Sequence, residues 1–233
     1  MVLMSEIKLC CPPGNEAVRY AAVYLKASGI PVTDTPEPDT THMLLPVPTR
    51  CFDDLPEGVT IVGGNLHCLP GCDTIDLLKD PQYLEENAAI TARCALPLIG
   101  KDLKDLPVLV LGWGRIGKRL GVYLADAGAM VTIAARKESD VAMIRALGYD
   151  GIFLEQAASA LPKFWAVLNT IPAMVLPAFK CRPDCVLLEL ASRPGMAGNN
   201  IIRASGLPGK YAPRESGELI ARRLLAILKE EGK

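Results

Sequence analysis

The sequence predicts an α/β protein with a doubly wound parallel sheet and a second, smaller α/β domain. The main observation is that short apolar runs alternate with amphipathic segments of helical period along residues 101–233. The charge balance also changes along the chain, because residues 1–100 hold 6 Lys and Arg against 13 Asp and Glu, whereas residues 101–233 hold 19 against 13. Half of the 233 residues are hydrophobic, so the chain can bury a core and is not disordered as a whole.

The smaller domain is assigned to residues 1–100. Its first segment, residues 6–10, alternates like a strand, and Asn15 can cap a helix that ends at Gly29. Two short apolar runs follow, residues 43–47 and 59–62, and the prolines around them exclude long helices. A helical segment, residues 83–98, then leads into the second domain as a linker helix.

The second domain, residues 101–213, has the clearer pattern. Residues 108–111 form a continuous apolar run, which is typical of a strand buried on both faces of a parallel sheet. The elements expected after it are helix 115–127, strand 130–134, helix 140–147, and strands within 166–168 and 185–190. Right-handed crossovers between such strands place helices on both faces of the sheet. The C-terminal helix, within residues 214–233, is expected to join the first domain.

A glycine-rich turn follows the first strand of this domain and opens its first helix. The residues Gly112-Trp113-Gly114-Arg115-Ile116-Gly117 fit the pattern G-x-G-x-x-G in the strand–turn–helix context that a dinucleotide-binding loop requires. In a Rossmann-type domain the first glycine allows the tight turn, the second lets backbone N–H groups approach a pyrophosphate, and the third allows close packing of the helix. The alternative is a tight turn that binds nothing.

The end of the second strand predicts which dinucleotide is bound. NAD-selective domains usually carry an acidic residue there, but this chain has Arg136 and Lys137, with no carboxylate before Glu138. Cationic side chains suit a 2′-phosphate, so we expect NADP(H), with NAD(H) as the alternative. A solvated strand end without a ligand is the other interpretation of these two residues.

Polar turns follow the later apolar runs, at the position where ligands of such folds bind. The first is Asn169-Thr170-Ile171-Pro172, and the second contains Ser192 and Arg193. The planar guanidinium of Arg193 can pair with a substrate carboxylate through two parallel hydrogen bonds. A surface arginine paired with a nearby acid is the alternative interpretation.

His67 is the candidate acid or base from the smaller domain, because it follows an apolar run in a glycine-rich segment and can reach a cleft between the domains. A hydrogen-bonded loop histidine is the simpler interpretation. The pairs Cys68/Cys72 and Cys181/Cys185 do not have C-x-x-C spacing and no histidine follows them at ligand distance, so we expect no metal site. Eight cysteines in a chain without an export signal are expected to be reduced thiols.

Four segments, in this order, resemble the family of the A-type subunit of bacterial dipicolinate synthase. They are the glycine turn, the turn at residues 169–172, Leu190-Ala191-Ser192-Arg193-Pro194-Gly195 and Gly206-Leu207-Pro208-Gly209. The resemblance covers about residues 81–233. The linker helix departs from the family's usual Thr-Ala-Glu-Gly-Ala at Arg93 and Cys94, and the N-terminal domain is shorter than in the family.

The resemblance implies a nicotinamide-nucleotide-binding subunit that works with a flavoprotein-like B-type subunit. Together they oxidise a cyclic dihydro- or tetrahydrodipicolinate-type dicarboxylate to dipicolinate in sporulation. On this sequence, the three glycines of the turn hold the pyrophosphate and Arg136 faces the adenosine ribose. The residues implied near the nicotinamide and the substrate are Asn169, Thr170, Ser192 and Arg193. A homo-oligomer is also expected.

Other classes of function fit the residues less well. A D-2-hydroxyacid dehydrogenase-like enzyme needs a histidine base in the nucleotide half, and both histidines, His42 and His67, lie before residue 100. A dinucleotide-binding sensor or non-catalytic subunit is the alternative from another class. Aromatic residues make up only 5% of the chain, so no nucleic-acid partner is expected, and no apolar stretch has the roughly 20 residues of a membrane span. Residues 1–6 contain no export signal, which predicts a cytoplasmic protein.

Overall fold

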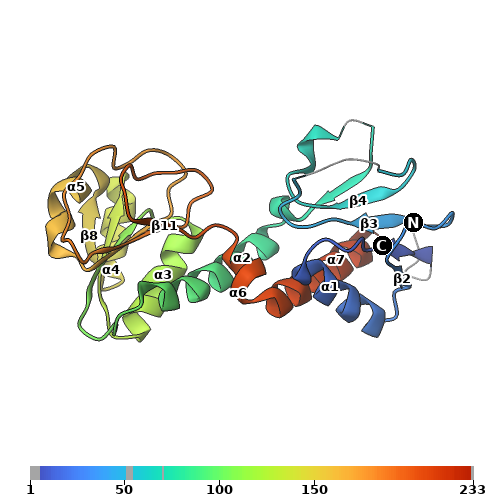
Figure 1. Cartoon of the computed structure of the whole chain (residues 1–233), viewed down its shortest axis with the longest axis horizontal. Coiled ribbons are helices and arrows are strands. Elements are labelled where there is room, and N and C mark those ends of the chain that lie inside the picture. Colours follow the sequence, from blue (N-terminus) through green and yellow to red (C-terminus); the bar gives the residue numbers. More distant parts are fainter. Residues whose placement is uncertain (1–5, 51–54, 70, 232–233) are drawn as a thin grey trace. The chain divides into compact units, whose positions relative to one another are not determined.

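The computed structural model describes residues 6–50, 55–69 and 71–231. Residues 1–5, on which the expected absence of an export signal rests, lie outside this description. The chain divides into two compact units: unit 1 contains the residues up to Asn87 and those from Pro208 onward, and unit 2 contains Ala88–Leu207. Each unit has one parallel sheet with helices beside it (Figure 1). The predicted α/β class, a doubly wound parallel sheet with a second α/β unit, is therefore confirmed.

Unit 1 contains a five-stranded parallel sheet in the order β2-β1-β3-β4-β5. Its strands are β1 (Leu9–Cys10), β2 (Val32–Thr33), β3 (His42–Leu44), β4 (Thr60–Gly63) and β5 (Thr74–Asp76). Helix α1 (Glu16–Ala27) begins as predicted, because Asn15 Oδ1 accepts a hydrogen bond of 2.8 Å from the N–H of Val18. The sequence patterns missed β2 and β5, which are too short for an alternation to be recognised.

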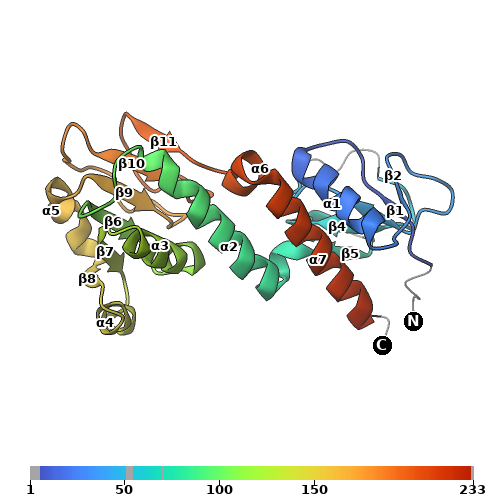
Figure 2. The same cartoon turned by 90° about the horizontal axis from the view of Figure 1, so that it is seen from below.

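The C-terminal helix α7 (Pro213–Glu231) lies beside α1 in unit 1 (Figures 1 and 2). Gly217 makes this close approach possible, since a Cβ atom there would lie 2.4 Å from the carbonyl oxygen of Ala17 and 2.8 Å from the backbone nitrogen of Ala21. One side of α7, including Leu224, is fully buried. Unit 1 is therefore assembled from both ends of the chain.

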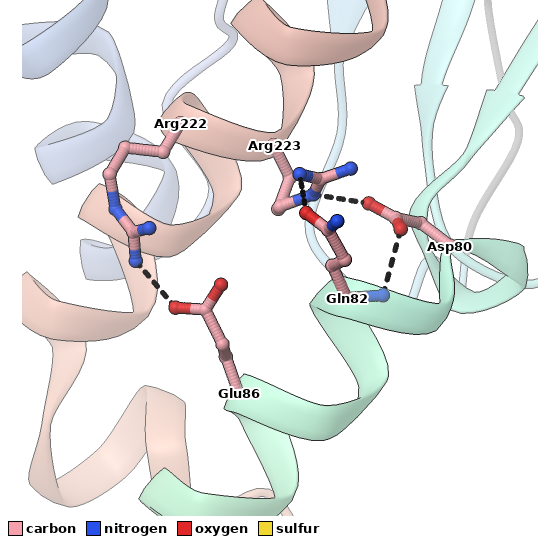
Figure 3. Close-up of polar contacts among 5 residues, drawn as sticks. All are labelled: Asp80, Gln82, Glu86, Arg222 and Arg223. Atoms are coloured by element: carbon pink, nitrogen blue, oxygen red, sulfur yellow. Dashed lines mark hydrogen bonds and ion pairs between the residues drawn. The ribbon is translucent and has the colours of Figure 1, made fainter.

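Two arginines of α7 bind the start of helix α2 (Pro81–Ala95), as Figure 3 shows. Arg222 donates to Glu86 Oε2 at 2.7 Å, and Arg223 donates to Asp80 Oδ2 at 2.5 Å. The sequence pattern predicts an ordinary solvated face for this Arg-Arg pair. That interpretation is wrong for Arg223, whose side chain is only 13% exposed, because its acidic partner comes from a distant part of the sequence.

Unit 2 contains a six-stranded parallel sheet in the order β11-β10-β9-β6-β7-β8, so the chain winds outward in both directions from β6 and β9. The strands are β6 (Pro107–Leu111), β7 (Met130–Ala135), β8 (Asp150–Phe153), β9 (Ala166–Asn169), β10 (Val186–Glu189) and β11 (Ile201–Arg203). The helices are α3 (Arg115–Asp126), α4 (Glu138–Ala146) and α5 (Ala157–Ala160), and α6 (Leu207–Tyr211) follows. The sequence patterns missed β8 and β11.

Apolar side chains cover both faces of this sheet. One cluster joins the strands to α3 and α4 through Leu120, Leu124, Val141 and Ile144. The other cluster, on the opposite side of the strands, includes Ala157 of α5. This two-sided burial explains why the strands are continuous apolar runs. In the part of the chain that the structure describes, no helix is long and apolar enough to cross a membrane.

Candidate functional site

The glycine turn lies at the centre of the unit 2 sheet, where the direction of winding reverses. Leu111 of β6 is level with Asn169 of β9 in the strand register, so the residues that follow them, Gly112 and Thr170, are neighbours. The carboxyl ends of the strands at such a switch point are where doubly wound folds bind their ligands.

Gly112 and Gly117 occupy positions that only glycine fits. Gly112 has a φ of +105°, and a Cβ atom there would lie 2.6 Å from Thr170 Oγ1 and 2.8 Å from Ile171 Cγ1. A Cβ atom at Gly117 would lie 2.1 Å from the carbonyl oxygen of Gly112. The first turn of α3 therefore packs directly on the glycine turn, which explains glycine at both positions.

Gly114 is the N-cap residue of α3 and leaves this end of the helix open. No side-chain hydrogen bond caps the helix there, and a Cβ atom on Gly114 would meet nothing within 4 Å. The N-terminus of a helix carries a partial positive charge and presents backbone N–H groups to an anion. The geometry of the turn therefore fits the pyrophosphate of a dinucleotide.

The side chains between the glycines anchor the turn to the domain. The ring of Trp113 is half-buried and meets Tyr149 edge-on at a centroid separation of 6.4 Å, and the Lys118 ammonium lies 5.7 Å from its centroid. Ile116 packs against the apolar cluster of α3 and α4, whereas Arg115 is exposed. Trp113 and Ile116 thus fix the turn, and its backbone is left to approach a ligand.

Thr170 joins the turn after β9 to the glycine turn. Its hydroxyl and its N–H both donate to the carbonyl oxygen of Leu111, at 2.8 and 3.0 Å. Ile171 is half-buried beside Gly112, and Pro172 is exposed. The structure therefore brings together the two turns that the sequence analysis selected independently.

Asn169 is fully buried and holds its own turn. Its Oδ1 accepts from the N–H of Ile171 at 3.1 Å, and its Nδ2 donates to the carbonyl oxygen of Ile171 at 3.0 Å and to Glu189 Oε1 at 2.7 Å. Both ends of the amide are thus used inside the protein. Direct contact of Asn169 with a ligand stays a prediction, and in this structure its side chain does not reach the surface.

Glu189, the last residue of β10, is a residue that the sequence analysis missed. It is 3% exposed, and its Oε2 accepts from the N–H groups of Gly195 and Met196 at 2.8 and 3.2 Å. Its position directly before the polar turn was the available signal. Nothing in the sequence, however, distinguishes a buried carboxylate from an exposed one at a strand end.

Ser192 and Arg193 lie on the loop that Glu189 holds, and both are exposed. Within residues 6–50, 55–69 and 71–231, Arg193 forms no ion pair in this structure. Its guanidinium is therefore available to an anion.

Arg136 lines a pocket of about 620 Å³ at the carboxyl ends of the strands. The other lining residues are Phe153, Leu154, Glu155, Ile171, Ala173, Met174 and Val175. Lys137, the N-cap residue of α4, is exposed beside Arg136. The acidic Glu155 of this pocket could not be recognised in the sequence, because β8 is short and the turn after it has no recognisable pattern.

His67 lies in unit 1 on the short helical turn Leu66–Cys68 that follows β4, and it is exposed. Asp76 holds this segment by accepting hydrogen bonds from the N–H groups of Asn65 and Leu66 at 3.2 and 3.1 Å. The structure describes no side-chain contact of His67 that assigns it a chemical role. Among the described residues, no group of three or more His, Cys, Asp or Glu side chains is placed to hold a metal ion.

The strand order, the glycine turn after β6 and the open N-terminus of α3 define the class of this protein. It is a two-unit α/β protein with a Rossmann-type dinucleotide-binding domain. Comparison with known proteins makes the class more specific.

The chain is 34% identical over 141 residues to the A-type subunit of dipicolinate synthase from Bacillus subtilis (strain 168), and the match covers 54% of this chain and 48% of that protein. It is 33% identical over 128 residues to a shikimate dehydrogenase (NADP(+)) of Acidiphilium cryptum (strain JF-5), and this match covers 54% of this chain and 42% of that protein. The chain thus spans about half the length of the curated relatives it matches. No family model matches it.

The fold is similar to that of the A-type dipicolinate synthase subunit from Bacillus halodurans, with a TM-score of 0.83 at 19% identity over 97% of this chain and 99% of that chain. The likeness in fold therefore includes unit 1, where the sequence resembles the family least. The chain is thus similar in sequence to an A-type dipicolinate synthase subunit over about half of its length, and similar in fold to such a subunit over nearly all of it.

Proposed function

We propose that the chain is an NADP-dependent oxidoreductase subunit that oxidises a cyclic dihydro- or tetrahydrodipicolinate-type dicarboxylate to dipicolinate. The observation that carries the proposal is the N-terminus of α3, which has no side-chain cap and is bordered by glycines that leave room for a pyrophosphate. The names of the two curated relatives, a dipicolinate synthase subunit and a dehydrogenase, support the reaction class.

The exposed residues at the strand ends have separate tasks in this proposal. A nicotinamide group, when bound, supplies a hydride acceptor for the hydrogen that the cyclic substrate must lose to become aromatic. Arg193 pairs with a substrate carboxylate, because its planar guanidinium forms two parallel hydrogen bonds and has no competing ion pair among the described residues. Ser192, next to it, offers a hydroxyl to the same ligand.

The preference for NADP(H) rests on Arg136. Its guanidinium borders the pocket next to the glycine turn, where it can pair with a 2′-phosphate. Glu155 borders the same pocket and opposes this preference, because a carboxylate repels a phosphate and accepts from a ribose hydroxyl. The choice of dinucleotide is therefore a balance between these two side chains.

Thermal unfolding with NADPH and NADH titrations tests the proposal. A ligand present at about 100 times its dissociation constant stabilises a protein by about 2.7 kcal/mol, and we expect this with NADPH rather than NADH. Arg136→Gln should lower the NADPH-to-NADH affinity ratio about tenfold, and Glu155→Gln should raise it. Lys163→Gln, an exposed cation elsewhere in unit 2, is the charge control. A protein that no dinucleotide stabilises would contradict the proposal.

A non-catalytic dinucleotide-binding subunit is the second candidate. It is favoured by one observation: unit 2 contains no histidine, and its buried polar pair, Asn169 and Glu189, is committed to internal hydrogen bonds. NADPH formation from the cyclic dicarboxylate, measured with and without a flavoprotein-like second subunit, separates the two functions. His67→Gln belongs in the same assay, and an unchanged rate would remove His67 from the candidate acids and bases.

A further inference from the structure

The carboxylate of Glu189 joins the turn after β9, which lies against the glycine turn, to the loop after β10, which carries Arg193. Its Oε1 accepts from Asn169 on the turn after β9, and its Oε2 accepts from Gly195 and Met196 on the loop after β10. Glu189 is the only buried Asp or Glu among the residues that the structure describes. Leaving a buried polar group without hydrogen-bond partners costs free energy. These three hydrogen bonds therefore strongly favour one arrangement of the two loops.

Gly195 fixes the end of the Arg193 loop against the turn after β9. A Cβ atom on Gly195 would lie 2.2 Å from Asn169 Nδ2 and 2.9 Å from the carbonyl oxygen of Ile171. The Gly195 carbonyl oxygen also accepts from the N–H groups of Val175 and Leu176, at 2.8 and 2.9 Å. The two loops are thus in direct backbone contact, with the Glu189 carboxylate between their hydrogen-bond donors.

The turn after β9 is in turn fixed to the glycine turn. Thr170 donates twice to Leu111 and lies against Gly112. A continuous series of contacts therefore runs from the glycine turn through Thr170 and Asn169 to Glu189 and the Arg193 loop. All of it lies within unit 2.

We infer that Glu189 is a positioning residue, which sets where Arg193 is presented relative to the glycine turn and so determines the affinity for a dicarboxylate. The inference rests on the proposed function, since it takes Arg193 as the anion-binding group. Glu189 itself touches no ligand, because both of its oxygens are occupied inside the protein. Its effect on the substrate is exerted through the loop.

Glu189→Gln is the informative variant, because it keeps the shape of the side chain and changes one oxygen to an NH₂ group. Whichever way the new amide lies, its NH₂ faces an N–H donor, either that of Asn169 or those of Gly195 and Met196. Adding Asn169→Asp reverses the pair: the new carboxylate accepts from the Gln NH₂ group, and the Gln oxygen accepts from Gly195 and Met196. The double variant loses the donation to the Ile171 carbonyl oxygen, 3.0 Å from Nδ2 in the wild type, and places an acceptor against that oxygen, so the rescue is expected to be partial.

Calorimetric titration of the full chain with NADPH, followed by dipicolinate as the dicarboxylate probe, tests the inference. We expect Glu189→Gln to weaken dipicolinate binding about tenfold while NADPH affinity changes less than about threefold, and the double variant to recover part of the loss. Asp150→Asn, an exposed carboxylate on β8, should change neither affinity. Equal losses for both ligands, or no rescue by the double variant, would show a general structural role and overturn the inference.

Hydrogen exchange in the ligand-free protein separates this inference from the proposed function. Glu189→Gln should speed the exchange of the Gly195 and Met196 amides at least about tenfold and leave those of β6 unchanged. Unchanged exchange at both amides would overturn the positioning role, whatever the protein binds. If the wild-type protein binds no NADPH but Glu189→Gln still speeds the exchange of the two amides, the proposed function is rejected and the positioning role is kept.

Discussion

The two units contain the same local arrangement, a parallel strand followed by a tight turn and a helix, and they complete it differently. In unit 1 the turn after β1 leads to Asn15, whose side chain caps α1 at 2.8 Å from the N–H of Val18. In unit 2 the turn after β6 leads to Gly114, and no side chain caps α3. One helix end is thus satisfied by a side chain of the protein itself, whereas the other has no side-chain cap, which is the condition that the proposed anion site requires.

The largest expected effect on stability is the difference between two glycine-to-alanine substitutions, one in the strand–turn–helix segment of each unit. Gly117→Ala places its Cβ 2.1 Å from the carbonyl oxygen of Gly112, so it should destabilise unit 2 by about 3 kcal/mol or more and abolish stabilisation by NADPH. Gly14→Ala in the unit 1 turn meets Pro46 at an ordinary 3.4 Å and should cost less than about 0.5 kcal/mol. Urea unfolding measures both, and equal costs would break the comparison.

The next largest effect is expected from the ion pairs that join α7 to the start of α2 in unit 1. Arg223→Ala removes a cation whose partner Asp80 has a side chain only 9% exposed, so unit 1 should lose about 3 kcal/mol. Arg222→Ala removes a half-exposed pair with Glu86 and should cost less than about 1 kcal/mol. Both tryptophans, Trp113 and Trp165, lie in unit 2, so hydrogen exchange rather than tryptophan fluorescence should detect the change. Similar costs for the two variants would contradict the assignment of Arg223 to a pair that is more shielded from water than that of Arg222.

A smaller effect is expected from exchanging the helix caps. Asn15→Ala removes the cap of α1 and should destabilise unit 1 by about 1 kcal/mol. Gly114→Asn gives α3 a cap in a suitable backbone conformation, φ −81° and ψ −170°, and should stabilise the ligand-free protein by a few tenths of a kcal/mol. The same variant should weaken NADPH binding, because the new side chain occupies the helix end. Unchanged NADPH affinity in Gly114→Asn would argue against the anion site.

The smallest effect is a difference in acid sensitivity between the units. Burial lowers the pKa of His42 below its ordinary 6.5, so the unfolded chain takes up a proton more readily than the folded one. The contribution of His42 to stability is therefore fully present above pH 6.5 and is lost as the pH falls through the lower, folded pKa. Unit 2 has no histidine, so unit 1 should lose stability first between about pH 7 and 5. His42→Gln should weaken this dependence of the stability of unit 1 on pH, with His67→Gln as the matched variant. An unchanged dependence on pH would rule out His42 as its source.

The parts of the fold that could be predicted are those that a short sequence pattern specifies without help from the rest of the chain. The cap at Asn15, the strand β6 and the glycine turn each combine a local pattern with a local cause, and the structure has them where the sequence predicts them. The short strands β5 and β8 could not be predicted, because they are held by pairing with neighbours and not by their own periodicity.

The candidate site was only partly accessible to sequence reasoning for a related reason. The strand pattern places both turns at the carboxyl ends of strands, and the structure has Thr170 beside Gly112. Burial, however, is a property of the whole domain. The sequence therefore did not show that Asn169 is enclosed, that Glu189 accepts its amide, or that Glu155 borders the same pocket as Arg136.

The packing of α7 on α1 through Gly217 has a consequence for the order in which the protein is made. Unit 2 is continuous in sequence and can fold as soon as Leu207 has left the ribosome, whereas unit 1 needs residues that are translated last. At about 5–20 residues per second, the delay between Asn87 and α7 is on the order of 10 s. Throughout that interval the side of α1 at Ala17 and Ala21, against which Gly217 packs in the finished protein, has no helix to cover it.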